Sequence, residues 1–405
     1  MLWTLKKIWY RVFQFVLTSC MYLMPWRQPE LLTGAGSIKK LPELIKSKGV
    51  HNVLIVTDSV LRKLGLLDSF FAACDAAGIK GIVYDGVEPN PSIENIEAAR
   101  KLYVDNKCDG IVAFGGGSAM DCAKAAGARV VKPRQSIAQM GGTLRVLKRI
   151  PPLFAVPTTA GTGSETTIAA VVTDRATHHK YAIQDLCLIP RYAVLDPELT
   201  VGLPPHITST TGMDTLTHAV EAYTNLFAPK STDKLAIEAV KLVFENLEIV
   251  YRDGKDLTAR ANMQLAAFYG GAAFTRACVG YVHGVAHTLG GLYGTPHGLA
   301  NAVILPYVME EFGPAVYFKL ARLAEAVGIN GKDDEEKAKA FIREIRRMNA
   351  DMRIQDKFDF IQDKDIPQMI KWAMKEANPI YPVPVLWHEP EFTALIARLR
   401  VSSNE

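Results

Sequence analysis

The order of apolar and polar positions predicts a parallel sheet in the first half of the chain. Short apolar runs occupy residues 51–56, 79–83 and 109–115, and each is followed by a segment whose apolar residues recur at helical spacing. Apolar runs of this length are typical of strands buried on both faces, and their alternation with helices indicates an α/β domain. We expect one continuous helix over residues 59–78, which ends at Gly78.

Further strand signals complete this domain. PPLFAVP (151–157) is an apolar run that leads into a loop rich in Gly, Thr and Ser. Residues 169–185 contain two strand-like runs around a polar turn, which predicts a hairpin. RYAVLDP (191–197) is the last strand signal before the pattern changes.

After Pro205 the pattern is helical only. Long helical patterns lie at 209–225, 231–254, 256–274 and 332–349. The chain has 405 residues, which exceeds the usual size of a domain with a single core. We therefore predict an N-terminal hydrophobic and basic helical extension (1–30), an α/β domain (31–203) and an all-helical domain (204–405).

The N-terminal extension has an unusual composition. Residues 8–24 are mostly apolar and aromatic, but Arg11 and Gln14 interrupt them, whereas a membrane-spanning helix needs about 20 apolar residues with few charges. Met24-Pro25-Trp26 is a poor cleavage site for a signal peptide. Three interpretations remain: a helix packed on its own domain or across a dimer, a helix that contacts a membrane surface through residues 1–26, and a spanning or cleaved segment.

The overall composition excludes other classes. Hydrophobic residues make up 49% and charged residues 22%, and the net charge is only +4, so we expect no nucleic-acid partner. The six cysteines are irregularly spaced and include no CxxC pair. Free thiols in a reducing compartment are the simplest interpretation, and we expect a cytoplasmic protein.

Two loops have the composition of a nucleotide site. GGGSAMD (115–121) follows a predicted strand and opens a helix, and PTTAGTGSE (157–165) follows another strand. Glycines allow close approach of a ligand, and the N-terminus of a helix favours phosphate. The alternative is an ordinary glycine-rich turn. Asp58, also at a strand end, could accept from a ribose hydroxyl or cap the next helix.

Two other segments combine one carboxylate with several imidazoles. DTLTHAVEAY (214–223) places Asp214 and His218 one helical turn apart, and GYVHGVAHTLGGLYGTPHG (280–298) adds His283, His287 and His297. A single histidine on a helix is more often structural, but such a set in two short blocks predicts a metal site. The donor types suit Fe²⁺, Zn²⁺, Co²⁺ or Ni²⁺. The spacing alone leaves open which histidines bind.

These segments resemble the iron-containing, or group III, alcohol dehydrogenases. The resemblance covers roughly residues 30–390 and rests on PNPSI, GGGSAMDCAK, PTTAGTGSE, DTLTHAVEAY and GYVHGVAHTLGGLYGTPHG. It implies the architecture shared with dehydroquinate synthase: an N-terminal nucleotide-binding α/β domain, an all-helical C-terminal domain, and an active site in the cleft. It also implies reversible hydride transfer between NAD(H) and a primary alcohol or its aldehyde, usually in a dimer or a larger homo-oligomer.

The resemblance also implies residue roles. Asp214, His218, His283 and His297 would bind Fe²⁺, with Zn²⁺ as the alternative ion, and His287 would be the catalytic proton relay. Phe274 would line the substrate pocket. The implied NAD contacts are Asp58, Asn90, Gly116, Gly117, Ser118, Thr158, Thr159, Thr162 and Lys180. The Asp58 carboxylate would disfavour the 2′-phosphate of NADP.

Departures from the family pattern leave the substrate open. Ala169 and Arg276 stand where relatives often carry Asn, and the first 30 residues extend beyond the usual family start. The alternatives within the superfamily are a glycerol dehydrogenase and a sugar-phosphate cyclase. Arg276 is the only basic residue in or just before 280–298, which disfavours a cyclase because its substrate is strongly anionic. A non-catalytic, membrane-associated scaffold is a further alternative.

Overall fold

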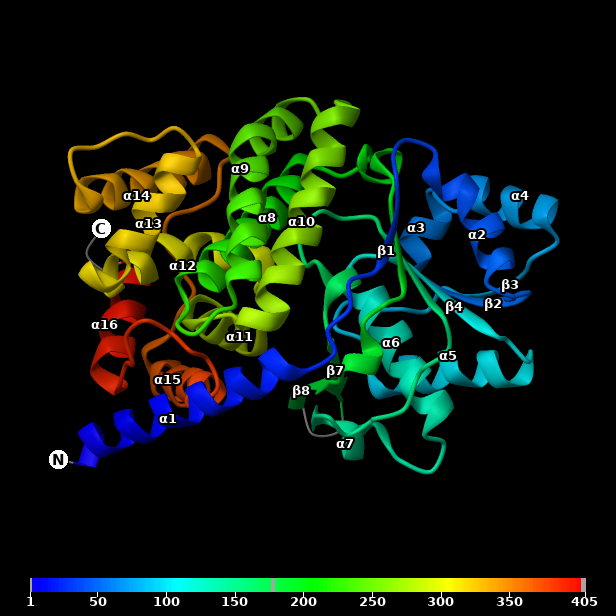
Figure 1. Cartoon of the computed structure of the whole chain (residues 1–405), viewed down its shortest axis with the longest axis horizontal. Coiled ribbons are helices and arrows are strands. Elements are labelled where there is room, and N and C mark those ends of the chain that lie inside the picture. Colours follow the sequence, from blue (N-terminus) through cyan, green and yellow to red (C-terminus); the bar gives the residue numbers. More distant parts are fainter. Residues whose placement is uncertain (1, 176–178, 402–405) are drawn as a thin grey trace. The chain divides into compact units, whose positions relative to one another are not determined.

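The computed structural model describes residues 2–175 and 179–401 and contains two compact units. One, the α/β unit, comprises residues 26–203 and 255–264. The other, the helical unit, comprises residues 1–25, 204–254 and 265–405. Figure 1 shows their elements along the chain.

The α/β unit is built on a parallel six-stranded sheet, as expected for this fold class. Its strands, in spatial order, are β1 (Glu30–Thr33), β9 (Tyr192–Leu195), β6 (Leu153–Pro157), β4 (Gly110–Gly115), β2 (Asn52–Val56) and β3 (Lys80–Tyr84). The helices of this unit are α2 (Leu41–Ser47), α3 (Ser59–Lys63), α4 (Asp68–Ala77), α5 (Ile93–Asp105), α6 (Gly117–Val131) and α7 (Ile137–Met140).

Helices cover both faces of this sheet, which explains why its strands read as continuous apolar runs. Along β4, Ile111 and Ala113 pack in a core with α5 and α6. Val112 and Phe114, which point the other way, pack with α2 and α4. Buried apolar neighbours on both sides hold each central strand in one register.

The predicted hairpin is present as β7 (Ala169–Asp174) and β8 (His179–Gln184), which pair antiparallel. They form a small second sheet with β5 (Gly142–Thr143). The expected turn, residues 176–178, lies outside the described residues. The single helix predicted over 59–78 is wrong: it is broken into α3 and α4, because Gly65 adopts a positive φ of 71° between them.

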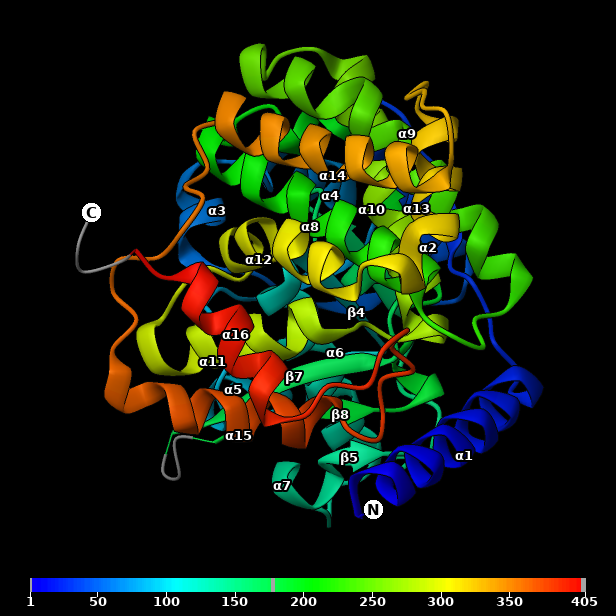
Figure 2. The same ribbon diagram turned by 90° about the vertical axis from the view of Figure 1, so that its left-hand side faces the viewer.

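The helical unit confirms the change of pattern after Pro205. Its helices are α8 (Pro205–Thr224), α9 (Lys230–Arg252), the second half of α10 (Leu257–Ala277), α11 (Tyr281–Tyr293), α12 (His297–Phe312), α13 (Pro314–Ala326), α14 (Asp334–Asp351), α15 (Ile366–Ala377) and α16 (Glu389–Leu399). Figure 2 shows α8, α11 and α12 within this unit. These three helices carry the candidate metal ligands.

The N-terminal extension forms one helix, α1 (Leu2–Leu23). Unlike a usual surface helix, it buries polar side chains and exposes apolar ones. Gln14 and Thr18 on its inner face are buried, and Arg11 is partly buried, because they bond within the helix and to the helical unit. The opposite face exposes Leu5, Ile8, Trp9, Val12, Phe13, Val16 and Leu23. Among the described residues, no helix has the length and apolar character needed to cross a bilayer.

Candidate metal centre and nucleotide loops

Helix α8 supplies the first two candidate ligands. Asp214 and His218 lie four residues apart and therefore project from one face of the helix. Both side chains are almost completely buried. Phe274 of α10 stacks on the His218 ring with 4.2 Å between ring centroids, so the aromatic residue expected in the substrate pocket borders the candidate metal ligands.

Helices α11 and α12 supply the other two ligands. His283 is buried in α11, and the partly exposed His297 begins α12. Gly298 allows α12 to approach α8, because a Cβ at this position would lie 2.4 Å from the carbonyl oxygen of Thr210. This close approach brings His297 Nε2 to 3.5 Å from Asp214 Oδ1.

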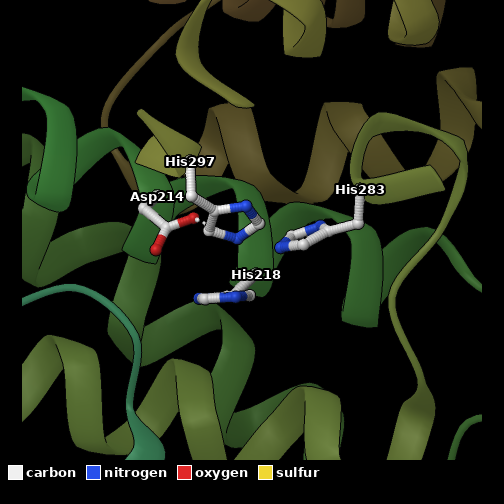
Figure 3. Close-up of side chains that lie close together, drawn as sticks. All are labelled: Asp214, His218, His283 and His297. Atoms are coloured by element: carbon white, nitrogen blue, oxygen red, sulfur yellow. Dashed lines mark ion pairs between the residues drawn. The ribbon is translucent and has the colours of Figure 1, made fainter. Parts of the chain in front are cut away.

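The four side chains converge on one point (Figure 3). One potential ligand atom from each of Asp214, His218, His283 and His297 lies within 4.8 Å of every other. Burial, followed by the neighbouring imidazoles, lowers the pKa of His283 well below its usual value. The neutral imidazole is the form that donates a lone pair to a cation, so the donor set fits a divalent metal ion.

A buried carboxylate orients His283. Glu221 Oε2 lies 2.6 Å from His283 Nδ1, and its Oε1 accepts from the backbone N–H of Val282 at 2.7 Å. Burial raises the pKa of Glu221 to about 8, although backbone hydrogen bonds oppose the rise. Contact at Nδ1 directs Nε2 of His283 toward the cluster, the arrangement typical of histidines that bind metals. Our sequence analysis missed Glu221, although it lies on the same face of α8 as Asp214.

Asn301 gives a second indication of a cation site. Its amide nitrogen lies 2.7 Å from Asp214 Oδ1 and 3.1 Å from the Nε2 atoms of both His283 and His297. Three lone pairs thus point at one electropositive group. The amide oxygen of Asn301 is buried and has no hydrogen-bond partner among the described residues. Sequence analysis missed this residue too, although it lies one turn after His297 in α12.

His287 is placed differently from the four clustered residues. It lies one turn after His283 in α11, but its side chain is 45% exposed. Its Nδ1 is 2.6 Å from Glu376 Oε1, and its ring stacks on His297 with 5.2 Å between centroids. The structure therefore gathers four of the five residues into one cluster and leaves His287 at its edge, while their roles as ligands and proton relay stay a prediction.

The two segments predicted to bind a nucleotide, after β2 and after β4, lie where the strand order of the parallel sheet reverses. From β2 the chain continues to β3 on one side, and from β4 it continues to β6 on the other. The loops after β2 and β4 consequently diverge, and such switch points bind ligands in open α/β sheets. Asp58 follows β2, and Gly116, Gly117 and Ser118 follow β4.

The second loop meets the first at the adjacent strand end. A Cβ on Gly116 would lie 3.4 Å from Thr159 Oγ1, and one on Gly117 would lie 3.0 Å from Thr162 Cγ2. Thr158 N donates to the carbonyl oxygen of Gly115 at 3.2 Å. The two segments therefore form one surface around the N-terminus of α6, which has Gly116 as its N-cap.

The remaining predicted cofactor residues gather beside this surface. Lys180 Nζ donates to Asn90 Oδ1 at 2.6 Å, and the backbone N–H of Asn90 donates to Ser118 Oγ at 3.2 Å. Asp58 Oδ1 caps α3 by accepting from the N–H groups of Val60 and Leu61. The capping role considered for Asp58 is thus present.

Known proteins resemble this chain over both units. The profile "Iron-containing alcohol dehydrogenase" matches residues 28–197, and "Fe-containing alcohol dehydrogenase family, C-terminal" matches residues 208–398. Alcohol dehydrogenase 4 of Schizosaccharomyces pombe is 40% identical over 359 residues, which are 87% of this chain and 84% of the relative.

Two solved structures agree. A 1,3-propanediol oxidoreductase has a TM-score of 0.89 at 36% identity and covers 93% of this chain and 100% of its own. Sulfoacetaldehyde reductase from Bifidobacterium kashiwanohense, in complex with NAD⁺, has a TM-score of 0.84 at 29% identity and covers 94% and 100%.

Proposed function

This chain belongs to the iron-containing alcohol dehydrogenase family, and on that premise we propose which residues perform its reaction. The family membership makes it an oxidoreductase that interconverts alcohols and aldehydes with NAD(H). We assign NAD binding to residues 31–203 and metal binding to residues 204–405. The observation that supports the assignment best is the convergence of Asp214, His218, His283 and His297.

These four side chains would hold Fe²⁺, with Zn²⁺ as the alternative ion. A bound ion would supply Lewis-acid chemistry to the oxygen of the alcohol or aldehyde. Glu221 keeps His283 oriented through Nδ1. Phe274 packs on His218 and provides an apolar wall for the carbon chain of the substrate.

His287 moves the proton. Its exposure connects the ring to solvent, and its contact with His297 places it beside the metal ligands. An imidazole ring can accept or donate a proton near neutral pH. In alcohol oxidation His287 accepts the proton of the hydroxyl group, and in aldehyde reduction it returns one.

The cofactor lies on the loops of the α/β unit. NAD(H) carries the hydride. The N-terminus of α6 with Gly116, Gly117 and Ser118 would hold the pyrophosphate, and the hydroxyl groups of Thr158, Thr159 and Thr162 would donate hydrogen bonds to the cofactor. Asn90 and Lys180 would contact the cofactor from the side. Since Asp58 caps α3 through Oδ1, its Oδ2 would accept from the ribose hydroxyls, and its negative charge would disfavour NADP.

A coupled assay tests this assignment. The protein is purified without oxygen and loaded with Fe²⁺, and NADH consumption is followed with straight-chain aldehydes from acetaldehyde to dodecanal. We expect turnover with at least one aldehyde. Absence of turnover in protein that retains iron and binds NADH would contradict the function.

We also propose a cytoplasmic location for the enzyme. The six cysteines, all within the described residues, are unpaired, which supports a reducing and therefore cytoplasmic compartment.

We propose a homodimer or larger homo-oligomer, because the outer face of α1 exposes more apolar surface than isolated side chains explain. Light scattering measures the mass in solution.

Peripheral membrane contact is a second proposal for the same face. Residues 1–29 contain four basic and no acidic residues, and the apolar face of α1 points away from the helical unit. A basic helix with an exposed aromatic face binds anionic lipid surfaces. Flotation with phosphatidylserine vesicles should carry the full chain upward, whereas Trp9→Ser with Phe13→Ser should leave it behind. Identical flotation of both proteins would contradict the proposal.

A further inference from the structure

A chain of contacts connects the N-terminal helix with His287, all within the helical unit. It begins at Glu376, near the end of α15, whose Oε1 lies 2.6 Å from His287 Nδ1. A carboxylate at Nδ1 selects the tautomer that carries its proton there. The other nitrogen, Nε2, then has the lone pair with which the ring exchanges a proton.

Tyr381 fixes the Glu376 carboxylate. Its hydroxyl group donates to Glu376 Oε1 at 2.8 Å, so this oxygen takes part in two short contacts. Burial, followed by the charge of Glu376, raises the pKa of Tyr381 well above its usual value, and the hydroxyl group therefore keeps the proton that it donates. Burial would also raise the pKa of Glu376, but His287 and Tyr381 outweigh it and lower this pKa, so the carboxylate stays ionised.

The segment that carries Tyr381 is irregular, and α1 supplies donors to it. Gln14 Nε2 donates to the carbonyl oxygen of Tyr381 at 2.7 Å. Arg11 donates to the carbonyl oxygens of Val383 and Pro384 at 2.7 and 2.9 Å, and to Gln14 Oε1 at 2.8 Å. Arg11 and Gln14 interrupt the mostly apolar stretch of residues 8–24. Backbone carbonyls outside regular structure need such donors when they are buried.

We infer that Glu376 and Tyr381 position His287 for proton transfer, and that α1 is part of this device because Arg11 and Gln14 hold the segment 381–384 in place. The inference rests on the proposed role of His287. It assigns the buried side of α1 a role in catalysis, separate from the roles proposed for its exposed face. Glu376 and Tyr381 are positioning residues, since their contacts reach the reaction only through the imidazole ring.

Variants of Glu376 provide the first test in the iron-loaded full chain. Glu376→Leu should lower kcat by about tenfold or more, because a mispositioned catalytic group costs this much, while iron content and KM for NADH remain unchanged. Glu376→Gln should retain most activity, since its amide oxygen can still accept from Nδ1. Equal activity of Glu376→Leu and the parent protein would overturn the inference, as would a Gln variant as slow as the Leu variant.

The second test concerns α1. Arg11→Met with Gln14→Met removes the hydrogen bonds to the segment 381–384 and retains the bulk, and Lys6→Met removes a charge from the same helix at an exposed position as a control. The double variant should lower kcat in the same direction as Glu376→Leu but less, and Lys6→Met should not. Should the double variant fold poorly, Gln14→Met alone removes the hydrogen bond to the carbonyl oxygen of Tyr381, and Tyr381→Phe tests the next contact, from that segment to Glu376, with the loss of a single oxygen.

Combination with His287→Ala separates the two proposals. If Glu376 and α1 act through His287, their substitutions should slow the His287→Ala enzyme no further. Additive losses in that background would overturn the positioning role. If His287→Ala alone has the parent kcat, the proton-relay function fails instead, whatever the Glu376 variants do.

Discussion

Two buried polar clusters, one in each unit, differ in whether the protein supplies all the hydrogen-bond partners of their polar atoms. In the α/β unit, the ammonium group of Lys124 is fully buried and donates to five oxygens of Ser164, Thr167 and Ala169 at 2.6 to 3.1 Å. In the helical unit, the ligand atoms of Asp214 and three histidines point at each other around one Asn301 amide. In the lysine cluster the protein supplies both the donor and its acceptors. The histidine cluster instead presents several lone pairs that a cation would satisfy.

The comparison teaches that burial of charge does not by itself identify a functional site. Burial lowers the pKa of Lys124 to about 8, against the attraction of Asp121 and Glu165, and it remains largely protonated at neutral pH. Its bonds join α6, which follows the first glycine loop, to the end of the second loop. Lys124 therefore holds the two loops together and finds all its acceptors within the protein, which distinguishes it from the residues of the histidine cluster.

The largest expected effect is the loss of a ligand from the histidine cluster. His218→Ala should lose iron and lower kcat/KM by about 10³-fold or more, because the Lewis acid contributes several kcal/mol to the transition state. Metal analysis and the aldehyde assay measure the two losses. His206→Ala, an exposed histidine at the start of α8, is the matched control and should keep both. Iron retained at parental stoichiometry in His218→Ala would remove it from the ligand set.

Lys124→Met tests whether the lysine cluster contributes to stability and not to metal binding. The carbonyl oxygens of Ser164, Thr167 and Ala169 would each lose a donor, so the free energy of unfolding should fall by about 3 kcal/mol. Thermal unfolding should show the loss, and NADH affinity should weaken as the loops separate. Iron content should stay unchanged. Lys132→Met, at the end of the same helix, is the control, and loss of iron in Lys124→Met would contradict the separation of the two clusters.

The sequence predicted the fold class because its apolar pattern depends on burial, and burial by helices on both faces is what a parallel sheet requires. Helical spacing made Asp214, His218 and three further histidines candidates for a metal site, and the family resemblance reduced them to the four residues whose side chains the structure brings together. Glu376 could not be found in this way, since 89 residues separate it from His287. Periodicity likewise did not reveal that α1 buries its polar face, because a helical pattern does not state which face points inward.

A moderate effect on iron affinity is expected from substitution of Glu221, which contacts His283 on the side of the ring away from the cluster. With a pKa of about 8, the Glu221 carboxyl group can ionise when a cation binds the cluster. Glu221→Gln keeps an acceptor near His283 Nδ1 but cannot develop that charge, so iron affinity should fall by about tenfold. Competition with a chelator measures it. Glu245→Gln, on α9, is the control for an exchange of the same kind at a site remote from the ligands. If Glu221→Gln bound iron as tightly as the parent, its carboxylate would be structural, like the bonds around Lys124.

The smallest effect is expected at Asp58, where capping and recognition coincide in one side chain. Asp58→Asn keeps a good N-cap for α3 and removes the charge, so the preference for NADH over NADPH should fall by about tenfold while the melting temperature is retained. Asp58→Ala should lose both the preference and about 1 kcal/mol of stability. The ratio of kcat/KM for the two cofactors measures the first and thermal unfolding the second. An Asn variant with parental preference would leave Asp58 as a capping residue only, and the discrimination against a 2′-phosphate would have to come from elsewhere on the loops.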